Sequence, residues 1–286
     1  MPRSQIEADP LATRRRITRL RKYVERTLLT DEQRFVCEWH RECKSSVPGY
    51  EFRPGTMSHI GRHYDLYRGD RPLRIMVVGQ ESGLARGKGA GERNARVSLE
   101  ERYRIIHDGS GLSRGYYAEG GRKGRNTHMR GVTQALRLAF DLGIGGEHDD
   151  EYVDTISGAR FHIFDGFALV NRLLCSAGTV GTSTERSSPT MRENCGSHFR
   201  VQLELLDPTL VILQGEGVRK WSAELLPERQ RYSDTLYATE IGSARALVCA
   251  FSHPSARGEL RWGDRLDAPY LKNVVAPTIR RALRRL

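Results

Sequence analysis

Groups that could break a covalent bond follow three apolar, strand-like segments. The stretch "LRIMVVG" (73–79) runs into Gln80 and Glu81, "FHIFDGFALV" (161–170) ends before Asn171, and "RALVCAF" (245–251) leads to His253. A carboxylate, a carboxamide and an imidazole are groups that acid–base and electrostatic catalysis use. Because the carboxyl ends of parallel strands meet at one edge of a sheet, we expect these side chains to share a crevice.

The elements that must hold these residues alternate between strand and helix patterns. This alternation predicts an α/β fold, specifically a three-layer α/β/α sandwich with a central, largely parallel sheet of four or five strands. Strands are expected at 73–78, 161–170, 209–215 and 245–251, and helices at 11–29, 127–142, 190–206, 216–226 and 268–285.

Two regions of different character are expected along the chain. Residues 1–72 combine a basic helix with an irregular, cysteine-bearing extension, which we expect to pack on the core. Residues 73–286 form the α/β domain, interrupted by a Gly- and Arg-rich insertion at 84–125 with one helical patch at 98–107. An insertion this long in a compact domain is usually functional.

The charge of the chain favours a polyanionic partner. There are 46 basic residues against 35 acidic ones, which gives a net charge of +11, and 40 of the basic residues are arginines. Arginine binds phosphate in a bidentate manner, so we expect DNA as the partner, although an arginine-rich source proteome is an alternative. The apolar runs are only strand-sized, and the charged N-terminus lacks the core of a secretory signal. We therefore expect a cytoplasmic monomer that does not contact membranes.

The cysteines and one glycine loop leave several readings open. Cys249 lies in an apolar run and is expected in the core, whereas Cys37, Cys43, Cys175 and Cys195 form two pairs. Four such thiols could hold an iron–sulfur cluster, bind zinc, or simply be buried. The loop Gly83–Gly89 is one residue short of a phosphate-binding loop and lacks its Ser/Thr, so we expect no nucleotide cofactor.

Taken in order, these segments resemble the uracil-DNA glycosylase superfamily, and most closely its iron–sulfur (family 4) branch. The motifs that carry the resemblance span roughly residues 73–285. They are "GQESG" (79–83), "NRLLC" (171–175), Cys195 followed by "FRVQLELLDPTLVILQG" (199–215), and "HPS" (253–255).

The resemblance implies a DNA glycosylase. Such an enzyme flips a base out of DNA and hydrolyses its N-glycosidic bond, here removing uracil or a modified pyrimidine in repair or in defence against phage DNA. It implies Glu81 as the carboxylate that orients water and stabilises the sugar cation, and His253 as the donor to the leaving base. Gln80, Ser82 and Asn171 are then expected to bind the base.

The resemblance also implies DNA contacts and a cofactor. Four residues of the last loop are expected to bind DNA, with Leu260 or Trp262 entering the base stack. A [4Fe–4S] cluster is expected on four cysteines, as a structural group rather than a redox one. The DNA-binding residues are Ser255, Arg257, Arg261 and Trp262, and the cluster ligands are Cys37, Cys43, Cys175 and Cys195.

The chain departs from the family pattern at three places. Gln80 stands where the iron–sulfur branch has its carboxylate, and Cys37 and Cys43 are spaced more widely than its first cysteine pair. Thr127 replaces an aromatic residue that stacks on the base, a role that Tyr116, Tyr117 or His128 could take. Two other functions stay open: a catalytically inactive DNA-binding member of the same fold, and a nucleotide-dependent enzyme that uses the Gly83–Gly89 loop.

Overall fold

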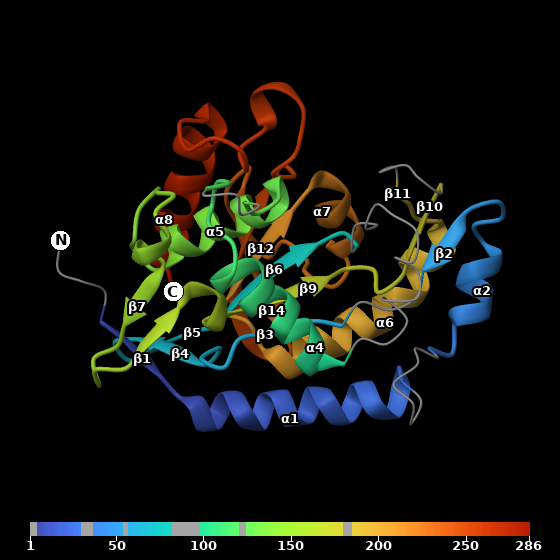
Figure 1. Cartoon of the computed structure of the whole chain (residues 1–286). Helices are drawn as coiled ribbons and strands as arrows, with labels where there is room; N and C mark the ends of the chain where they lie inside the picture. The colour runs from blue at the N-terminus through green and yellow to red at the C-terminus, as the bar shows by residue number, and fades with distance from the viewer. Residues whose placement is uncertain (1–4, 30–36, 54–56, 82–97, 120–123, 180–184) are drawn as a thin grey trace.

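The chain is built around one seven-stranded sheet (Figure 1). The computed structural model describes residues 5–29, 37–53, 57–81, 98–119, 124–179 and 185–286. In order across the sheet, the strands are β13 (Gln230–Ser233), β14 (Leu236–Ile241), β15 (Ala244–Phe251), β12 (Leu210–Gln214), β6 (Ile75–Gly79), β9 (Phe167–Asn171) and β3 (His59–Ile60).

The four central strands are parallel, and the three outer ones are antiparallel to their neighbours. Strands β15, β12, β6 and β9 are those expected from their apolar runs, and every residue of β12, β6 and β9 is buried. The sheet is larger than the expected four or five strands because β3, β13 and β14 were not anticipated. These three join by antiparallel pairing and have weaker sequence patterns.

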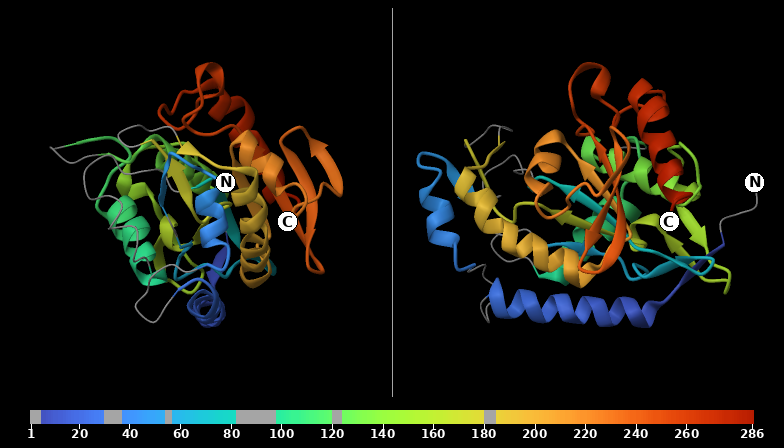
Figure 2. Two further views of the ribbon diagram at one scale, coloured as in Figure 1. Left: turned by 90° about the vertical axis from the view of Figure 1, so that its right-hand side faces the viewer. Right: turned by 180° about the vertical axis from the view of Figure 1, so that it is seen from behind.

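Alternate residues of each central strand enter two separate apolar cores. On β6, Ile75 and Val77 pack on one side of the sheet, and Met76 and Val78 on the other. The first core contains α5 (Thr127–Ala139) and α8 (Ala276–Leu283). Helices α1 (Pro10–Thr27), α6 (Pro189–Leu206) and α7 (Glu216–Ser222) contribute to the second. This arrangement confirms the three-layer α/β/α sandwich (Figure 2).

The remaining elements are short. They are α2 (His40–Ser45), α4 (Leu99–Tyr103), two π-helices (Arg104–Leu112 and Leu271–Val275), and the small sheets β1–β4–β5 (Ile6–Ala8, Leu66–Arg68, Arg71–Leu73), β11–β10–β2 (Glu185–Arg186, Ser176–Gly178, Glu51–Arg53) and β7–β8 (Tyr152–Asp154, Arg160–His162). No helix in these ranges has the length and apolar character needed to cross a membrane.

Two expected elements are divided in the structure. The strand expected at 161–170 is split by a short 3₁₀ turn, Ile163–Asp165. The Asp165 carboxylate accepts a hydrogen bond from the backbone N–H of Arg62 at 2.7 Å. The closing helix begins as a π-helix that changes to α8 next to Pro277. Proline has no N–H, so the regular hydrogen-bond ladder cannot continue through it.

The first 72 residues pack on the sheet and also extend it. Strand β3 pairs with β9, and Leu20 and Val24 of α1 join the same core as α6. Arg16 fixes α1 because its guanidinium donates to both carboxylate oxygens of Asp65 and to the Leu205 carbonyl. The helix therefore has one buried face, and its other face is exposed to solvent.

A second buried arginine organises the start of α5. The Arg125 guanidinium donates to both Glu151 oxygens at 2.6 Å, to Thr133 Oγ1, and to the carbonyls of Ser110 and Gly111. Both charged side chains are 0% exposed. This network joins the first π-helix, the N-terminus of α5 and the β7–β8 hairpin.

We expect Glu151→Gln to destabilise the protein by about 3–5 kcal/mol, because it leaves the Arg125 charge buried without a counter-charge. The free energy of unfolding from urea titration measures this effect. Asp267→Asn breaks the exposed pair with Arg265 and serves as the control. Equal stability of the two variants would contradict a structural role for the buried pair.

Candidate functional site

The carboxyl ends of the central strands form a single row. Strand register aligns Phe251 with Gln214, and Gly79 with Asn171; Gln214 lies next to Gly79 because the residues before them are paired. Neighbouring strands are about 4.8 Å apart, so the row of four strand ends spans about 14 Å along this edge of the sheet, where the sequence predicts the crevice. Glu81 and His253 follow β6 and β15, which places the predicted site residues along this edge.

Gly79 brings a carboxamide and an imidazole close to the backbone. A methyl group added there would lie 3.2 Å from Asn171 Oδ1 and 3.6 Å from His128 Cε1. The amides of Arg172 and Leu173 donate to the carbonyls of Gly79 and Gln80 at 2.9 and 2.8 Å. The turn after β6 is therefore fixed to the end of β9, and Asn171 has a defined position over it.

The turn carries the predicted carboxylate. Gln80 Nε2 donates to Glu81 Oε1 at 3.0 Å. The other amide atom of Gln80, Oε1, lies against Gly217 in the first turn of α7, 3.3 Å from where a methyl group there would stand. Gln80 therefore positions Glu81 instead of pointing freely into the crevice. Ser82 lies outside the described residues.

His253 is arranged as a neutral hydrogen-bond donor. Its Nδ1 accepts the backbone N–H of Ser255 at 3.1 Å, so Nε2 carries the proton in the neutral ring. Burial lowers the pKa of His253 below its ordinary value. A neutral imidazole with a fixed Nε2–H suits stabilisation of a developing anion.

His128, at the start of α5, is the aromatic residue that stands in the crevice. Its ring stacks on His253 with centroids 5.5 Å apart and planes inclined by 17°. Burial, the His253 ring and Arg102 lower the pKa of His128 to about 3. Of the other two candidates, Tyr116 is 0% exposed, and Tyr117 packs edge-on against it at the surface.

Two further residues had no role in the predicted site, although Gln214 was expected at the same edge of the sheet. Arg102 of α4 is a partly buried cation whose pKa falls to about 10 through desolvation, and it lowers the pKa of both His59 and His128. Gln214 is 0% exposed, and its carboxamide has no hydrogen-bond partner within the described ranges. The signal for Gln214 was a polar residue ending the apolar strand "TLVILQ"; nothing in the sequence singled out Arg102.

The loop after His253 exposes only part of its expected DNA-binding set. Ser255, Arg257 and Arg261 are exposed, and Arg261 pairs with Asp264. Trp262 does not fit the prediction: it is 0% exposed, packs on Phe251 and donates to the Ser252 carbonyl at 2.8 Å. It therefore closes the loop, and Leu260, which is 53% exposed, is the apolar residue at the surface.

Four of the five cysteines share one core. Cys37, Cys43, Cys175 and Cys195 lie in the α1–α6 core, whereas Cys249 lies in the other. The Cys195 thiol accepts the backbone N–H groups of Leu174 and Cys175; burial nonetheless raises its pKa. Burial likewise raises the pKa of Cys37 to about 11. Binding a metal group would thus require these buried thiols to lose their protons.

The four thiols do not form a compact metal-binding shell in the described ranges. No three of the four thiols lie within 4.8 Å of one another, which is not the compact shell that zinc needs. Asn194 Nδ2 lies 3.6 Å from Cys43 Sγ, and His198 Nε2 lies 3.1 Å from Cys37 Sγ. The buried Arg172 guanidinium raises the acidity of Cys195. The Asn194 and Arg172 contacts lower the pKa of Cys43 and Cys195, but burial outweighs them and the net pKa of both thiols is raised.

The other group of metal-ligating side chains is already satisfied. His148, Glu151 and His162 are the three such residues whose donor atoms converge in the described part of the chain. Both Glu151 oxygens accept hydrogen bonds from Arg125, and His162 Nε2 lies 3.0 Å from one of them. The arrangement is a buried ion pair, and it stabilises the fold.

The sequence matches no family model and no curated protein. The family resemblance therefore depends on the ordered sequence motifs alone.

We expect His128→Phe to weaken the pH dependence of stability. Folded His128 has a pKa of about 3, against 6.5 in the unfolded chain, so its contribution to stability is present above pH 6.5 and is lost as the pH falls toward 3. Phenylalanine keeps an aromatic ring at this position but cannot be protonated. Urea unfolding at several pH values between these limits measures the slope; identical slopes for wild type and variant would contradict burial of a neutral His128.

Proposed function

We propose that this chain is a DNA glycosylase that removes uracil or a modified pyrimidine and leaves an abasic site. One observation carries the proposal: Glu81, Asn171 and a neutral His253 follow three strands of the same parallel sheet and line its carboxyl edge. Hydrolysis of an N-glycosidic bond passes through a cationic sugar and an anionic base. The edge offers the Glu81 carboxylate for the cationic sugar and the His253 imidazole for the anionic base.

Each side chain has a distinct role in the proposed reaction. The Asn171 carboxamide, held over Gly79, pairs with the edge of the flipped pyrimidine, because it offers both a donor and an acceptor. Glu81, oriented by Gln80, directs water to the sugar and stabilises its positive charge. The Nε2–H of His253 donates to the base oxygen as negative charge develops there. Arg102 adds a partly buried positive charge near His128.

The loop after β15 is the proposed duplex contact. Ser255, Arg257 and Arg261 are exposed beside His253, where they suit phosphate groups. Leu260 replaces Trp262 as the proposed wedge, because only Leu260 is exposed. The loop lies at the top of the molecule in Figures 1 and 2, where it is drawn in colours near the red end of the scale.

We expect Glu81→Gln and His253→Ala to abolish most excision activity. Loss of a positioned carboxylate costs about 10²–10⁴-fold, and loss of one donor to a developing anion about 10²–10³-fold. Oligonucleotides that carry uracil or modified cytosines, followed by alkaline cleavage at abasic sites, give single-turnover rates for each variant.

Glu240→Gln is the matched control, because Glu240 is an exposed carboxylate on the outer strand β14. DNA binding without excision of any substrate would instead favour a catalytically inactive DNA-binding protein. Nucleotide hydrolysis lost in Lys88→Ala would favour the third reading, whose Gly83–Gly89 loop lies outside the described residues.

We further propose that Cys37, Cys43, Cys175 and Cys195 hold a [4Fe–4S] cluster, which would stabilise the core beside the crevice without taking part in hydrolysis. Protein purified without oxygen is expected to contain iron and inorganic sulfide and to show a broad visible absorption band. Cys195→Ser should lose all three, whereas Cys249→Ser, in the other core, should retain them. Colourless protein that binds zinc would contradict the cluster.

A further inference from the structure

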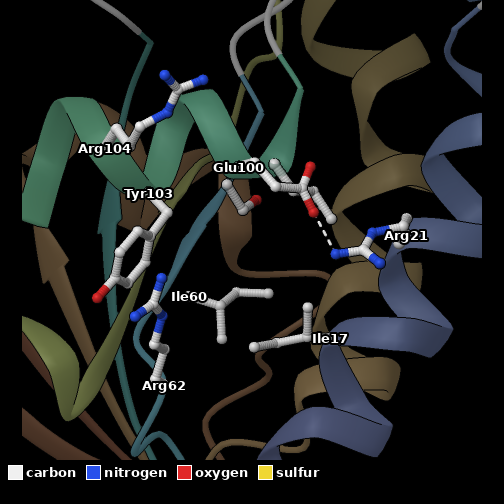
Figure 3. Close-up of a pocket in the computed structure, with 9 residues that line it drawn as sticks. Ile17, Arg21, Ile60, Arg62, Glu100, Tyr103 and Arg104 are labelled. Carbon is white, nitrogen blue, oxygen red and sulfur yellow. Dashed lines mark hydrogen bonds and ion pairs between the residues drawn. The ribbon is translucent and has the colours of Figure 1, made fainter.

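A separate cavity of about 290 Å³ opens between α1, α4 and the edge strand β3 (Figure 3). Its walls are apolar: Ile17 and Ile60 point toward one another, and Leu99 closes the α4 side. None of the residues that line it belongs to the crevice described above. Its volume suits a single small group, at the lower end of what ligand pockets enclose.

Arginines surround the mouth of this cavity. The Arg62 guanidinium lies 4.5 Å from the centroid of the Tyr103 ring, and Arg104 is exposed. Neither has an ion-pair partner among the described residues. Arg21 pairs with Glu100 across the opening, but both are about half exposed, so this pair is weak and easily replaced.

The outward face of α1 continues this basic surface. Besides Arg21, its exposed side chains include five cations and one acid, Glu25, and none of these five cations pairs with an acidic residue in the described ranges. Four of them, at positions 15, 19, 22 and 26, are three or four residues apart, which is about 4.5–6 Å along the helix, and the fifth is adjacent to the first of these. The five cations are Arg14, Arg15, Arg19, Lys22 and Arg26.

We propose that the cavity and the outward face of α1 together bind single-stranded nucleic acid, with one unstacked base in the cavity and the neighbouring phosphates on the arginines. Single-strand binding surfaces combine a cationic track with apolar or aromatic surfaces for bases, which are the two features present here. This surface is distinct from the crevice: α1 lies at the bottom of the molecule, and the loop after β15 at the top (Figures 1 and 2).

The surface fits other polyanions less well. A duplex keeps its bases stacked, so it cannot place one in the cavity without flipping it. A membrane surface needs apolar residues beside the cations, and Leu11, at the start of α1, is the large exposed apolar residue of this helix. The inference does not depend on base excision, because it concerns binding alone.

Photo-cross-linking locates the bound base directly. An oligothymidylate of about 15 nucleotides carrying one iododeoxyuridine is irradiated with the wild-type protein, and the linked peptides are identified by mass spectrometry. We expect links to peptides that carry Ile17 or Tyr103. Links confined to peptides that carry Asn171 or His253 would overturn the proposal.

The salt dependence of oligonucleotide binding tests whether Arg62 and Arg104 contact phosphates. Binding of the oligothymidylate is followed by fluorescence anisotropy over a range of salt concentrations for Arg62→Ser/Arg104→Ser. Each lost phosphate contact lowers the slope of log affinity against log salt by about 0.7, so we expect a reduction of about 1.4. Arg280→Ser/Arg284→Ser removes the same charge from exposed positions on α8 and directly after it, and should leave the slope unchanged.

Equal effects of the two double variants would overturn the proposal, because they would show only a general charge effect. The proposal would also be overturned if the protein bound vesicles of anionic lipid, or an acidic peptide, but did not bind the oligonucleotide. An excision assay on duplex substrates is run in parallel. Excision without oligothymidylate binding rejects this inference alone, and binding without excision of any base rejects only the proposed reaction.

Discussion

The hydrogen bonds that tie the turn after β6 to the end of β9 are the constraint on which the crevice depends. They hold Gly79 and Gln80 against Arg172 and Leu173, so that the Asn171 side chain lies over a residue with no side chain of its own. The gap left by Gly79 lets Asn171 and His128 approach the backbone together. A larger residue there would displace the Asn171 and His128 side chains.

A second constraint is the burial of charge around this gap. His128 and His253 are kept neutral by burial, and Arg102 adds to the effect on His128. The Arg125–Glu151 pair holds α5, which carries His128, against the β7–β8 hairpin. Neutral imidazoles beside a partly buried guanidinium form an environment that favours an anion over a cation. This polarity agrees with a leaving group that departs with negative charge.

The central strands and the order of the chemical groups could be predicted from the sequence, because buried parallel strands are continuous apolar runs and their ends lie at one edge. The antiparallel strands β3, β13 and β14 could not be predicted from the sequence. Strand β3 has two residues in an irregular segment, and its pairing is set by the edge of β9. Burial also could not be read from residue type. Trp262 and Arg102 both belong to types found at DNA surfaces, yet tertiary packing buries Trp262 completely and Arg102 in part.

Burial also changes what the net charge means. Several arginines that contribute to the charge of +11 are engaged inside the fold: Arg16 with Asp65, Arg125 with Glu151, and Arg172 with the carbonyls of Trp221 and Arg192. These guanidinium groups stabilise the structure and cannot reach a phosphate. A case for nucleic acid binding must therefore depend on where the remaining cations lie. Exposed cations occur on several elements, and two of the groups lie on the outward face of α1 and in the loop after β15, which are separate surfaces. One polyanion could engage both only if it extended around the molecule, and a duplex with a single-stranded end has that form.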